Sequence, residues 1–299
     1  MTKCGTGPSR STGGLVVAVT VFGARGNVGR HVVDGLLAAG EQVRAVGRTP
    51  ATDPRPGFDH VRADLDHVET LPAAFDGADR MFLYGMLDPQ RPYDIGEVIA
   101  TAVAAGVRQV VLLSSVSVLD ADGDHPVPVR NRTIEQTIQR SGVDWTFLRP
   151  GSFAVNTRTW WAHSIRTDDV VRLPHPLAHS APVHEKDIAA LAVTALTEPG
   201  HSHQAYTVYG AESLTLQRQV EHIGEAIGRP IRIEHVSEEI ARADIGRTMH
   251  PAVAEAIVGQ WAAASGVPAT TSAIVEKITG TPAHTFAQWA DGHADDFRR

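Results

Sequence analysis

The chain has 299 residues, 42% of them hydrophobic, and a formal net charge of −7. This length holds one large domain or two modest ones, each with its own buried core. The negative charge and the lack of any block rich in lysine and arginine argue against a nucleic-acid surface, because phosphate backbones bind to a concentrated basic face. We expect a small-molecule partner instead.

The single cysteine, Cys4, lies in a segment rich in Gly, Ser and Pro, and we expect residues 1–13 to form a flexible tail. One cysteine cannot form an internal disulfide, which favours a reducing, cytoplasmic compartment. The 15 histidines include no His-Glu-x-x-His spacing, so no metal is expected. No apolar stretch approaches the ~20 residues of a membrane helix, so no membrane partner is expected.

The first half of the chain alternates short runs rich in Val and Leu with segments of helical period. This pattern is typical of a parallel sheet covered on both faces, and it predicts a doubly wound α/β Rossmann domain over residues 14–155. The predicted strands are Val16–Phe22, Gln42–Val46, Phe58–Ala63, Arg80–Tyr84, Gln109–Ser114 and Trp145–Leu148. The predicted helices run from Val28 to Gly40, near Tyr93–Ala105 and near Asn131–Arg140.

After Pro150 the alternation of strand and helix patterns becomes irregular, and a polar, proline-bearing stretch predicts that a second lobe begins there. We expect a smaller α+β lobe over residues 156–299. The segment 188–209 has the composition to return to the main sheet, with a helix at Ile188–Thr197 and a strand at Ala205–Tyr209. Helices of the smaller lobe are predicted at Leu214–Ile227 and Pro251–Ala264.

A glycine-rich loop, Gly23-Ala24-Arg25-Gly26-Asn27-Val28-Gly29, follows the first strand and opens the first helix. In this position glycines allow a tight turn, close approach of backbone amides to a pyrophosphate, and close packing of helix on strand. The loop therefore predicts a dinucleotide site. Its predicted cofactor contacts are Gly23, Arg25, Gly26, Asn27, Val28 and Gly29.

The end of the second predicted strand indicates which dinucleotide is bound. A site for NAD places an acidic residue there to hold the ribose 2′-hydroxyl, whereas this chain has Gly47-Arg48. Arg48, with Arg25, is suited to pair with a 2′-phosphate, which predicts NADP(H). The alternative is that both arginines are solvated surface residues.

Two further strand ends are predicted to border the adenosine half of the cofactor or the nicotinamide ribose. In the alternative interpretation Asp64 caps a helix and Tyr84 is part of the core. The predicted contacts are Asp64, Leu65, Tyr84, Gly85 and Met86.

Several longer segments together resemble one family. They are GARGNVG at 23–29, VRAVGR at 43–48, VRQVVLLSS at 107–115, SGVDWTFLRPGSFAVN at 141–156, PVHEKDIA at 182–189 and TFAQWADGHADDF at 285–297. The chain is similar to the NmrA-like branch of the atypical short-chain dehydrogenases/reductases, which includes NAD(P)H:quinone and azo-type reductases and NADP-sensing regulators.

The resemblance implies that two segments border the nicotinamide, and both follow predicted strands, where ligands of open parallel sheets bind. In the alternative interpretation the two serines are ordinary strand-end hydroxyls. The implied contacts are Ser114, Ser115, Pro150, Gly151, Ser152 and Phe153.

The chain departs from the wider superfamily in its proton donors. None of its four tyrosines has a lysine four residues later. Relatives often carry Lys or His at the position that aligns with Asn131, and an amide has no titratable proton near neutral pH. Asn131 remains suited to hydrogen-bond the ribose or the carboxamide, and Asn131 and Ser115 are the candidates for a catalytic role.

Residues outside the cofactor motifs receive weaker assignments. Asp187 is predicted to cap the helix at Ile188–Thr197, with His184 a candidate pocket residue beside it. The aromatic residues of 285–297 recur at helical spacing and predict a terminal clamp. A substrate pocket in the second lobe is predicted from Phe153, Asn156, Trp160, Trp161, Met249 and His250.

These features favour hydride transfer to a quinone-like or other conjugated small molecule, including substrates of secondary metabolism. Reduction of a simple ketone needs a proton donor that the chain lacks, whereas a conjugated acceptor spreads the charge and takes its proton from water. The alternative is a catalytically silent NADP(H) sensor that acts through a protein partner. The sequence leaves open a monomer or a homodimer.

Overall fold

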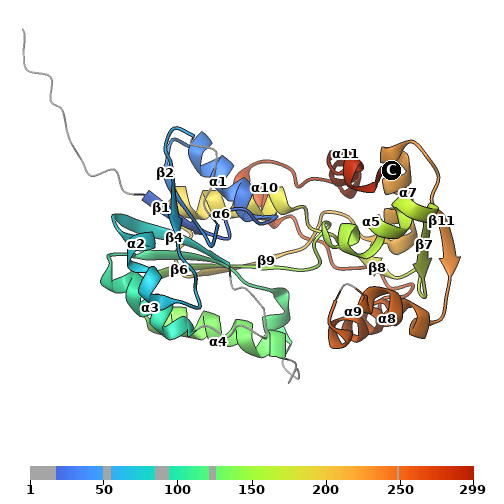
Figure 1. The fold of residues 1–299 in the computed structure, drawn as a ribbon, viewed down its shortest axis with the longest axis horizontal. Coiled ribbons are helices and arrows are strands. Elements are labelled where there is room, and N and C mark those ends of the chain that lie inside the picture. The colour runs from blue at the N-terminus through green and yellow to red at the C-terminus, as the bar shows by residue number, and fades with distance from the viewer. Residues whose placement is uncertain (1–17, 50–54, 85–93, 121–125, 248) are drawn as a thin grey trace, which may run out of the picture.

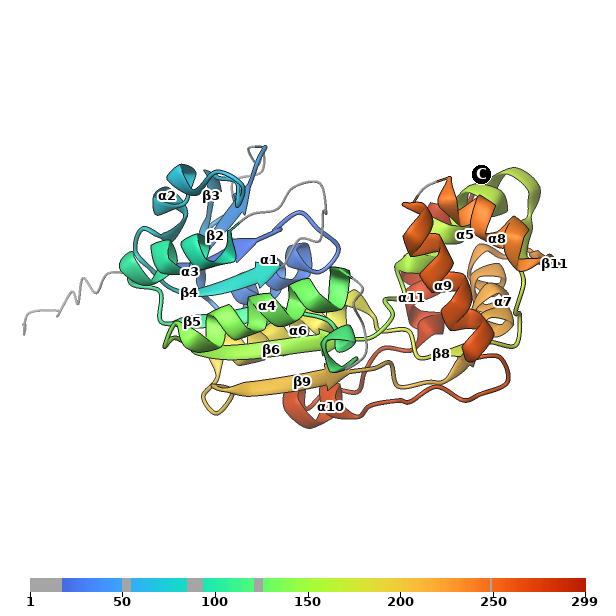
Figure 2. The ribbon, with the colours of Figure 1, turned by 90° about the horizontal axis from the view of Figure 1, so that it is seen from below.

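The computed structural model describes residues 18–49, 55–84, 94–120, 126–247 and 249–299. Two lobes lie side by side along the long axis of the molecule (Figures 1 and 2). The larger lobe is built on a seven-stranded sheet in the order β3-β2-β1-β4-β5-β6-β9, and every pairing in it is parallel. Its strands are β1 (Ala18–Phe22), β2 (Gln42–Gly47), β3 (Phe58–Arg62), β4 (Ala78–Tyr84), β5 (Gln109–Leu113), β6 (Asp144–Pro150) and β9 (Gln204–Val208).

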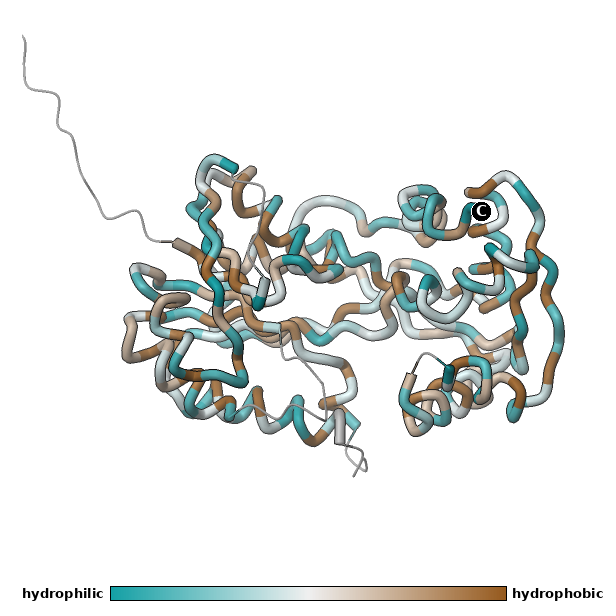
Figure 3. Tube along the Cα trace, in the orientation of Figure 1, coloured by the Kyte–Doolittle hydropathy of each residue, from teal (hydrophilic) through white to brown (hydrophobic). Residues whose placement is uncertain are grey.

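Helices cover both faces of this sheet, and this arrangement confirms the predicted doubly wound α/β fold (Figure 1). One face packs against α1 (Gly29–Ala38), α6 (Glu185–Thr197) and α10 (Ile274–Thr279). The other face packs against α2 (Pro72–Phe75), α3 (Ile95–Ala104) and α4 (Pro126–Arg140). Short 3₁₀ turns lie at η1 (Val68–Thr70) and η2 (Val116–Leu119). Hydrophobic and hydrophilic segments alternate along α4, as expected of a helix with one buried face (Figure 3).

The smaller lobe combines helices with two small two-stranded sheets around a separate hydrophobic core. Its helices are α5 (Asn156–Asp168), α7 (Leu216–Ile227), α8 (Glu238–Gly246), α9 (Pro251–Ala263), α11 (Phe286–Gly292) and α12 (Ala294–Phe297). Strand β7 (Val170–Leu173) pairs in parallel with β11 (Arg232–His235). Strand β8 (His179–Ser180) pairs in an antiparallel manner with β10 (Leu214–Thr215).

The chain crosses between the lobes more than once. It leaves the sheet after β6 and returns to it as α6 and β9. After α9 it returns again as α10, where Val275 joins the core beneath α1 and α6 (Figure 2). Only then does it finish in the smaller lobe as α11 and α12. No boundary at a single position therefore separates the two cores.

Helix α6 corrects one prediction. It begins at Glu185 rather than at Ile188, and its N-cap is His184, whose Nδ1 accepts the Lys186 amide at 3.1 Å. Asp187 is therefore not the cap. It lies in the first turn and accepts the backbone amide of His284 at 3.0 Å, a partner 97 residues away. The physical reason is that a tertiary contact uses the carboxylate that the local pattern assigned to capping.

Candidate functional site

The loop after β1 has the backbone that its glycines predict. Gly23 has a φ of +68°, in the region that favours glycine, and its carbonyl accepts the Gly26 amide at 2.8 Å. A Cβ atom on Gly29 would lie 2.1 Å from the Gly23 carbonyl oxygen, so only glycine lets α1 start this close to the turn. A Cβ on Gly26 would meet only that oxygen, at 3.1 Å.

A pocket of about 370 Å³ lies beside this loop, at the carboxyl ends of β1, β2, β3 and β4. It brings together seven residues that the sequence predicted as cofactor contacts: Gly23, Arg25, Gly26, Arg48, Asp64, Leu65 and Tyr84. Seven other lining residues were not singled out: Phe22, Ala24, Val46, Gly47, Thr49, Ala63 and Asp66. The position of the strand ends, rather than any motif, is the signal that identifies them. The predicted contacts Gly85 and Met86 lie outside the described residues.

Positive charge faces one side of this pocket. Arg25 and Arg48 are both exposed, and neither has an ion-pair partner within the described part of the chain. Asp64 lines the pocket and also organises its own loop, since its Oδ1 accepts the Asp66 amide at 3.3 Å. A guanidinium group in the loop after β1 and another at the end of β2 suit a phosphate group.

Ser114 directly follows β5 at the carboxyl edge of the sheet, and its side chain points into the protein. Its hydroxyl donates to Oε1 of Glu135 at 2.6 Å, and Arg149 donates to both oxygens of the same carboxylate at 3.0 and 2.6 Å. Ser114 is 8% exposed and Glu135 5%. The hydroxyl of Ser115 caps η2 by accepting the Ser117 amide. Both serine hydroxyls therefore have structural partners.

Asn131 lies one turn before Glu135 on α4. It is 3% exposed, and its Nδ2 atom has no hydrogen-bond partner among the described residues. A buried amide donor without a partner carries a desolvation cost of about 1–3 kcal/mol. Such a donor is available to a ligand.

The segment after β6 joins the two lobes. Gly151 donates its amide to Val208 at 2.9 Å, and a Cβ there would lie 2.9 Å from the ring of Tyr209. The carbonyl of Ser152 accepts the Val183 amide at 2.8 Å, and Phe153 packs against the cores of both lobes. Residues Pro150 to Phe153 are thus fixed at the edge of the sheet.

The smaller lobe contains a second pocket, of about 380 Å³, between α5, α8 and α9. Of the six predicted substrate-pocket residues, only Trp160 and Trp161 line it, and Trp161 is largely part of the core at 3% exposure. Trp261 lines it as well and stands edge-on to Trp160, with centroids 5.4 Å apart. His250 instead caps α9 by accepting the Ala252 amide. The six residues do not form one pocket.

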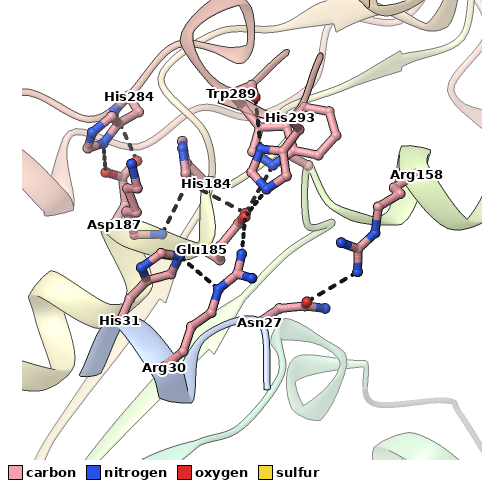
Figure 4. Close-up of polar contacts among 12 residues, drawn as sticks. Asn27, Arg30, His31, Arg158, His184, Glu185, Asp187, His284, Trp289 and His293 are labelled. Atoms are coloured by element: carbon pink, nitrogen blue, oxygen red, sulfur yellow. Dashed lines mark hydrogen bonds and ion pairs between the residues drawn. The ribbon is translucent and has the colours of Figure 1, made fainter. Parts of the chain in front are cut away.

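A cluster of polar side chains joins α1, α6 and the C-terminal segment (Figure 4). Its centre is Glu185, which is fully buried: Oε2 accepts the Trp289 indole N–H at 3.1 Å, and Oε1 lies 2.9 Å from His293 Nε2. Arg30, in the first turn of α1, approaches the same carboxylate at 3.8 Å. The sequence missed Glu185 because its partners come from two distant segments. Trp289 and Phe297, predicted as part of a clamp, are fully buried.

Among the described residues no group of three or more His, Cys, Asp or Glu side chains is placed to hold a metal ion. In the same part of the chain, no helix is long and apolar enough to cross a membrane.

Comparisons with known proteins agree with the geometry of the sheet edge. A family model described as NAD(P)H-binding matches residues 23–199. The (4-alkanoyl-5-oxo-2,5-dihydrofuran-3-yl)methyl phosphate reductase of Streptomyces griseus is 38% identical, over 93% of this chain and 99% of that protein. The NAD(P)H azoreductase of Xenophilus azovorans is 33% identical over the same shares. The NADPH-dependent quinone oxidoreductase of Escherichia coli, solved with NADPH, has a TM-score of 0.76 at 22% identity, covering 92% of this chain and 99% of that one.

Proposed function

Because the chain belongs to the NAD(P)H-binding family, in its NmrA-like reductase branch, we propose that it transfers hydride from NADPH to a small, electron-poor conjugated acceptor. Membership confirms the resemblance predicted from the sequence, and the chain is an NAD(P)H-dependent reductase. The preference for NADPH and the nature of the acceptor are our proposal.

The described residues fit a dinucleotide. The Gly23–Gly29 turn leaves backbone amides at the start of α1 open to a pyrophosphate, and the adjoining pocket offers Arg25 and Arg48 to a 2′-phosphate. In this assignment the remaining contacts to the dinucleotide come from Asn27, Val28 and the main chain of Pro150 to Phe153. When bound, the reduced nicotinamide supplies the hydride.

The observation that carries the choice of acceptor is Asn131, with its buried and unpartnered Nδ2. An amide cannot deliver a proton to an alkoxide, but it can donate a hydrogen bond to an oxygen on which charge develops. In a conjugated carbonyl compound the hydride bonds to the β carbon, the C=C π pair forms a new double bond to the carbonyl carbon, and the C=O π pair moves onto the oxygen. Water then protonates the α carbon of the resulting enolate. Asn131 would stabilise the oxygen in the step that creates the charge.

The relatives' names support this class of acceptor. The Streptomyces protein is named for a 5-oxo-2,5-dihydrofuran, a lactone whose C=C bond is conjugated with its carbonyl, and the Xenophilus protein for azo compounds. We therefore propose an unsaturated lactone, enone or quinone, with a compound of secondary metabolism as the natural substrate. The pocket between α5, α8 and α9, with its three indoles, is our candidate for the apolar part of such a molecule.

The test is a record of NADPH oxidation at 340 nm against quinones, azo dyes, unsaturated lactones, enones and simple ketones. We expect turnover of the conjugated compounds and little with ketones. With deuterium at C4 of NADPH, the label should appear at the β carbon of an enone, and in heavy water solvent deuterium should appear at the α carbon. Tight NADPH binding without oxidation by any acceptor would replace the proposal with an NADP(H) sensor.

A further inference from the structure

Arg158 crosses from the smaller lobe to the glycine loop. It lies in the first turn of α5, and its Nη2 atom is 3.4 Å from Oδ1 of Asn27, between Gly26 and Gly29 (Figure 4). Its Nη1 atom is 3.5 Å from Oδ2 of Asp296 on α12. The guanidinium is therefore held above the loop by one long hydrogen bond and one long ion pair.

Neither contact is a strong partner for the hydrogen-bond donors of the Arg158 guanidinium. The group carries five N–H donors in a planar fork that matches the oxygens of a phosphate, and charge-assisted bonds of this kind are normally 2.7–2.9 Å long. Both contacts of Arg158 exceed that length, and its side chain is still 35% exposed. The loop beneath it contains no acidic residue, so no carboxylate in residues 23–29 competes for the charge.

The position coincides with the part of the loop assigned to the cofactor's pyrophosphate. The amides of Asn27 to Gly29 lead into α1, and the positive end of that helix faces the same space as the Arg158 guanidinium. A pyrophosphate bound there would bring two negative charges within reach of a cation that is now paired with a neutral amide oxygen. Exchange of Asn27 for phosphate would replace a weak contact with a strong one.

We propose that Arg158 is a cofactor-binding residue supplied by the smaller lobe, pairing with the pyrophosphate of NAD(P)H and drawing α5 onto the glycine loop. Because α5 also carries Asn156 and Trp160, this contact would fix the position of the substrate lobe relative to the bound nicotinamide. The inference rests on the family's cofactor site and is independent of the acceptor.

The experiment measures binding of NADPH and of 2′-AMP, which lacks the pyrophosphate, by fluorescence titration and calorimetry. Arg158→Met, which keeps the apolar stem, should weaken NADPH binding about tenfold. It should leave 2′-AMP affinity unchanged, and it should make NADPH affinity less sensitive to salt. Arg158→Lys should retain part of the affinity, since it keeps the charge without the planar fork. A thermal denaturation midpoint close to that of the wild type shows that each variant is folded.

Asp296→Asn is the matched control, because it removes the competing carboxylate and leaves Arg158 in place. We expect this variant to bind NADPH as tightly as the wild type or more tightly. Unchanged NADPH affinity in Arg158→Met would overturn the proposal, and so would equal losses for NADPH and 2′-AMP. The experiment measures the binding of NADPH and 2′-AMP and not turnover. A failure of the Arg158 proposal is therefore distinct from a failure to reduce conjugated acceptors.

Discussion

Nε2 of His293 lies 2.9 Å from Oε1 of Glu185, and this contact ties the C-terminal segment to the first turn of α6. Burial alone would lower the pKa of His293, but the bonds to Glu185 and to the Trp289 carbonyl, together with the nearby negative charges, raise the pKa above 6.5. Burial alone would raise the pKa of Glu185, but the bond from His293, a backbone hydrogen bond and the charges of His184 and His293 together lower it below 4.5. Both groups are therefore charged in the folded protein over an overlapping range of pH.

The first prediction concerns the stability that this pair provides. The Glu185 contribution is present above pH 4.5 and is lost as pH falls through its lowered pKa, and the His293 contribution is present below pH 6.5 and is lost as pH rises through its raised pKa. Glu185→Gln should lower the free energy of unfolding by about 3 kcal/mol at pH 5.5 and by less at pH 9. Urea denaturation at the two pH values measures this. Glu225→Gln, which breaks an exposed pair with Arg218, is the control and should lower the free energy of unfolding far less, because solvent screens that pair.

The second prediction concerns His184. Burial lowers its pKa from 6.5 to about 4, and its Nδ1 accepts the Lys186 amide, which a ring protonated at that atom could not do. As pH falls from 6.5 to 4 the unfolded state binds a proton first, so His184 should remove up to about 3 kcal/mol of stability. His184→Asn keeps a capping side chain and removes the titration. The loss of stability between pH 7 and pH 4.5 should be smaller in this variant, and parallel pH profiles would contradict the assignment.

The glycine loop, the parallel sheet and the cofactor class were predictable because their signals are local. Positive φ at Gly23 and the contact at Gly29 are requirements of one turn, and they appear in the sequence as a fixed spacing. The partners of Glu185 and Ser114 were not predictable, because they lie on elements that only the tertiary fold brings together. Trp261 was missed for the same reason, since nothing in α9 alone indicates that its indole meets Trp160.

The third prediction separates cofactor binding from folding within the loop. Gly26→Val should abolish NADPH binding, because its side chain occupies the space of the pyrophosphate, and it should leave the fold nearly intact since its Cβ meets only the Gly23 oxygen, at 3.1 Å. Gly29→Ala should instead destabilise the fold, because its Cβ would lie 2.1 Å from that oxygen and backbone must move. Thermal denaturation and NADPH titration of both variants are the measurements. Near-native affinity in Gly26→Val would show that the phosphate loop is misplaced.

The fourth prediction concerns the choice between NADPH and NADH. Arg48→Met should weaken NADPH binding about tenfold and leave NADH almost unaffected, because only NADPH has the 2′-phosphate that a guanidinium pairs with. Arg25→Met should also weaken NADPH binding. The double variant Arg25→Met/Arg48→Met should show little preference for NADPH over NADH. Arg62→Met is a control at the end of β3, outside the residues that line the pocket. Equal affinities of the wild type for the two cofactors would contradict the assignment.

The last prediction concerns Asn131 and the charge that hydride transfer creates. Asn131→Ala removes a buried donor that has no protein partner, so it should relieve a desolvation cost and leave stability equal to or above that of the wild type. If Nδ2 serves the developing oxyanion, the same variant should lower kcat on an enone about 100-fold with little change in KM, because the bond strengthens in the transition state. The pH profile should keep its shape, since an amide does not titrate.

Asn131→Asp provides the matched control, since it keeps the size of the side chain but repels the developing charge, and it should be slower than Asn131→Ala above pH 6. Stopped-flow records of NADPH oxidation and urea denaturation measure both effects. A loss confined to NADPH affinity would place Asn131 on the ribose or the carboxamide rather than on the acceptor, and an unchanged kcat would remove it from catalysis.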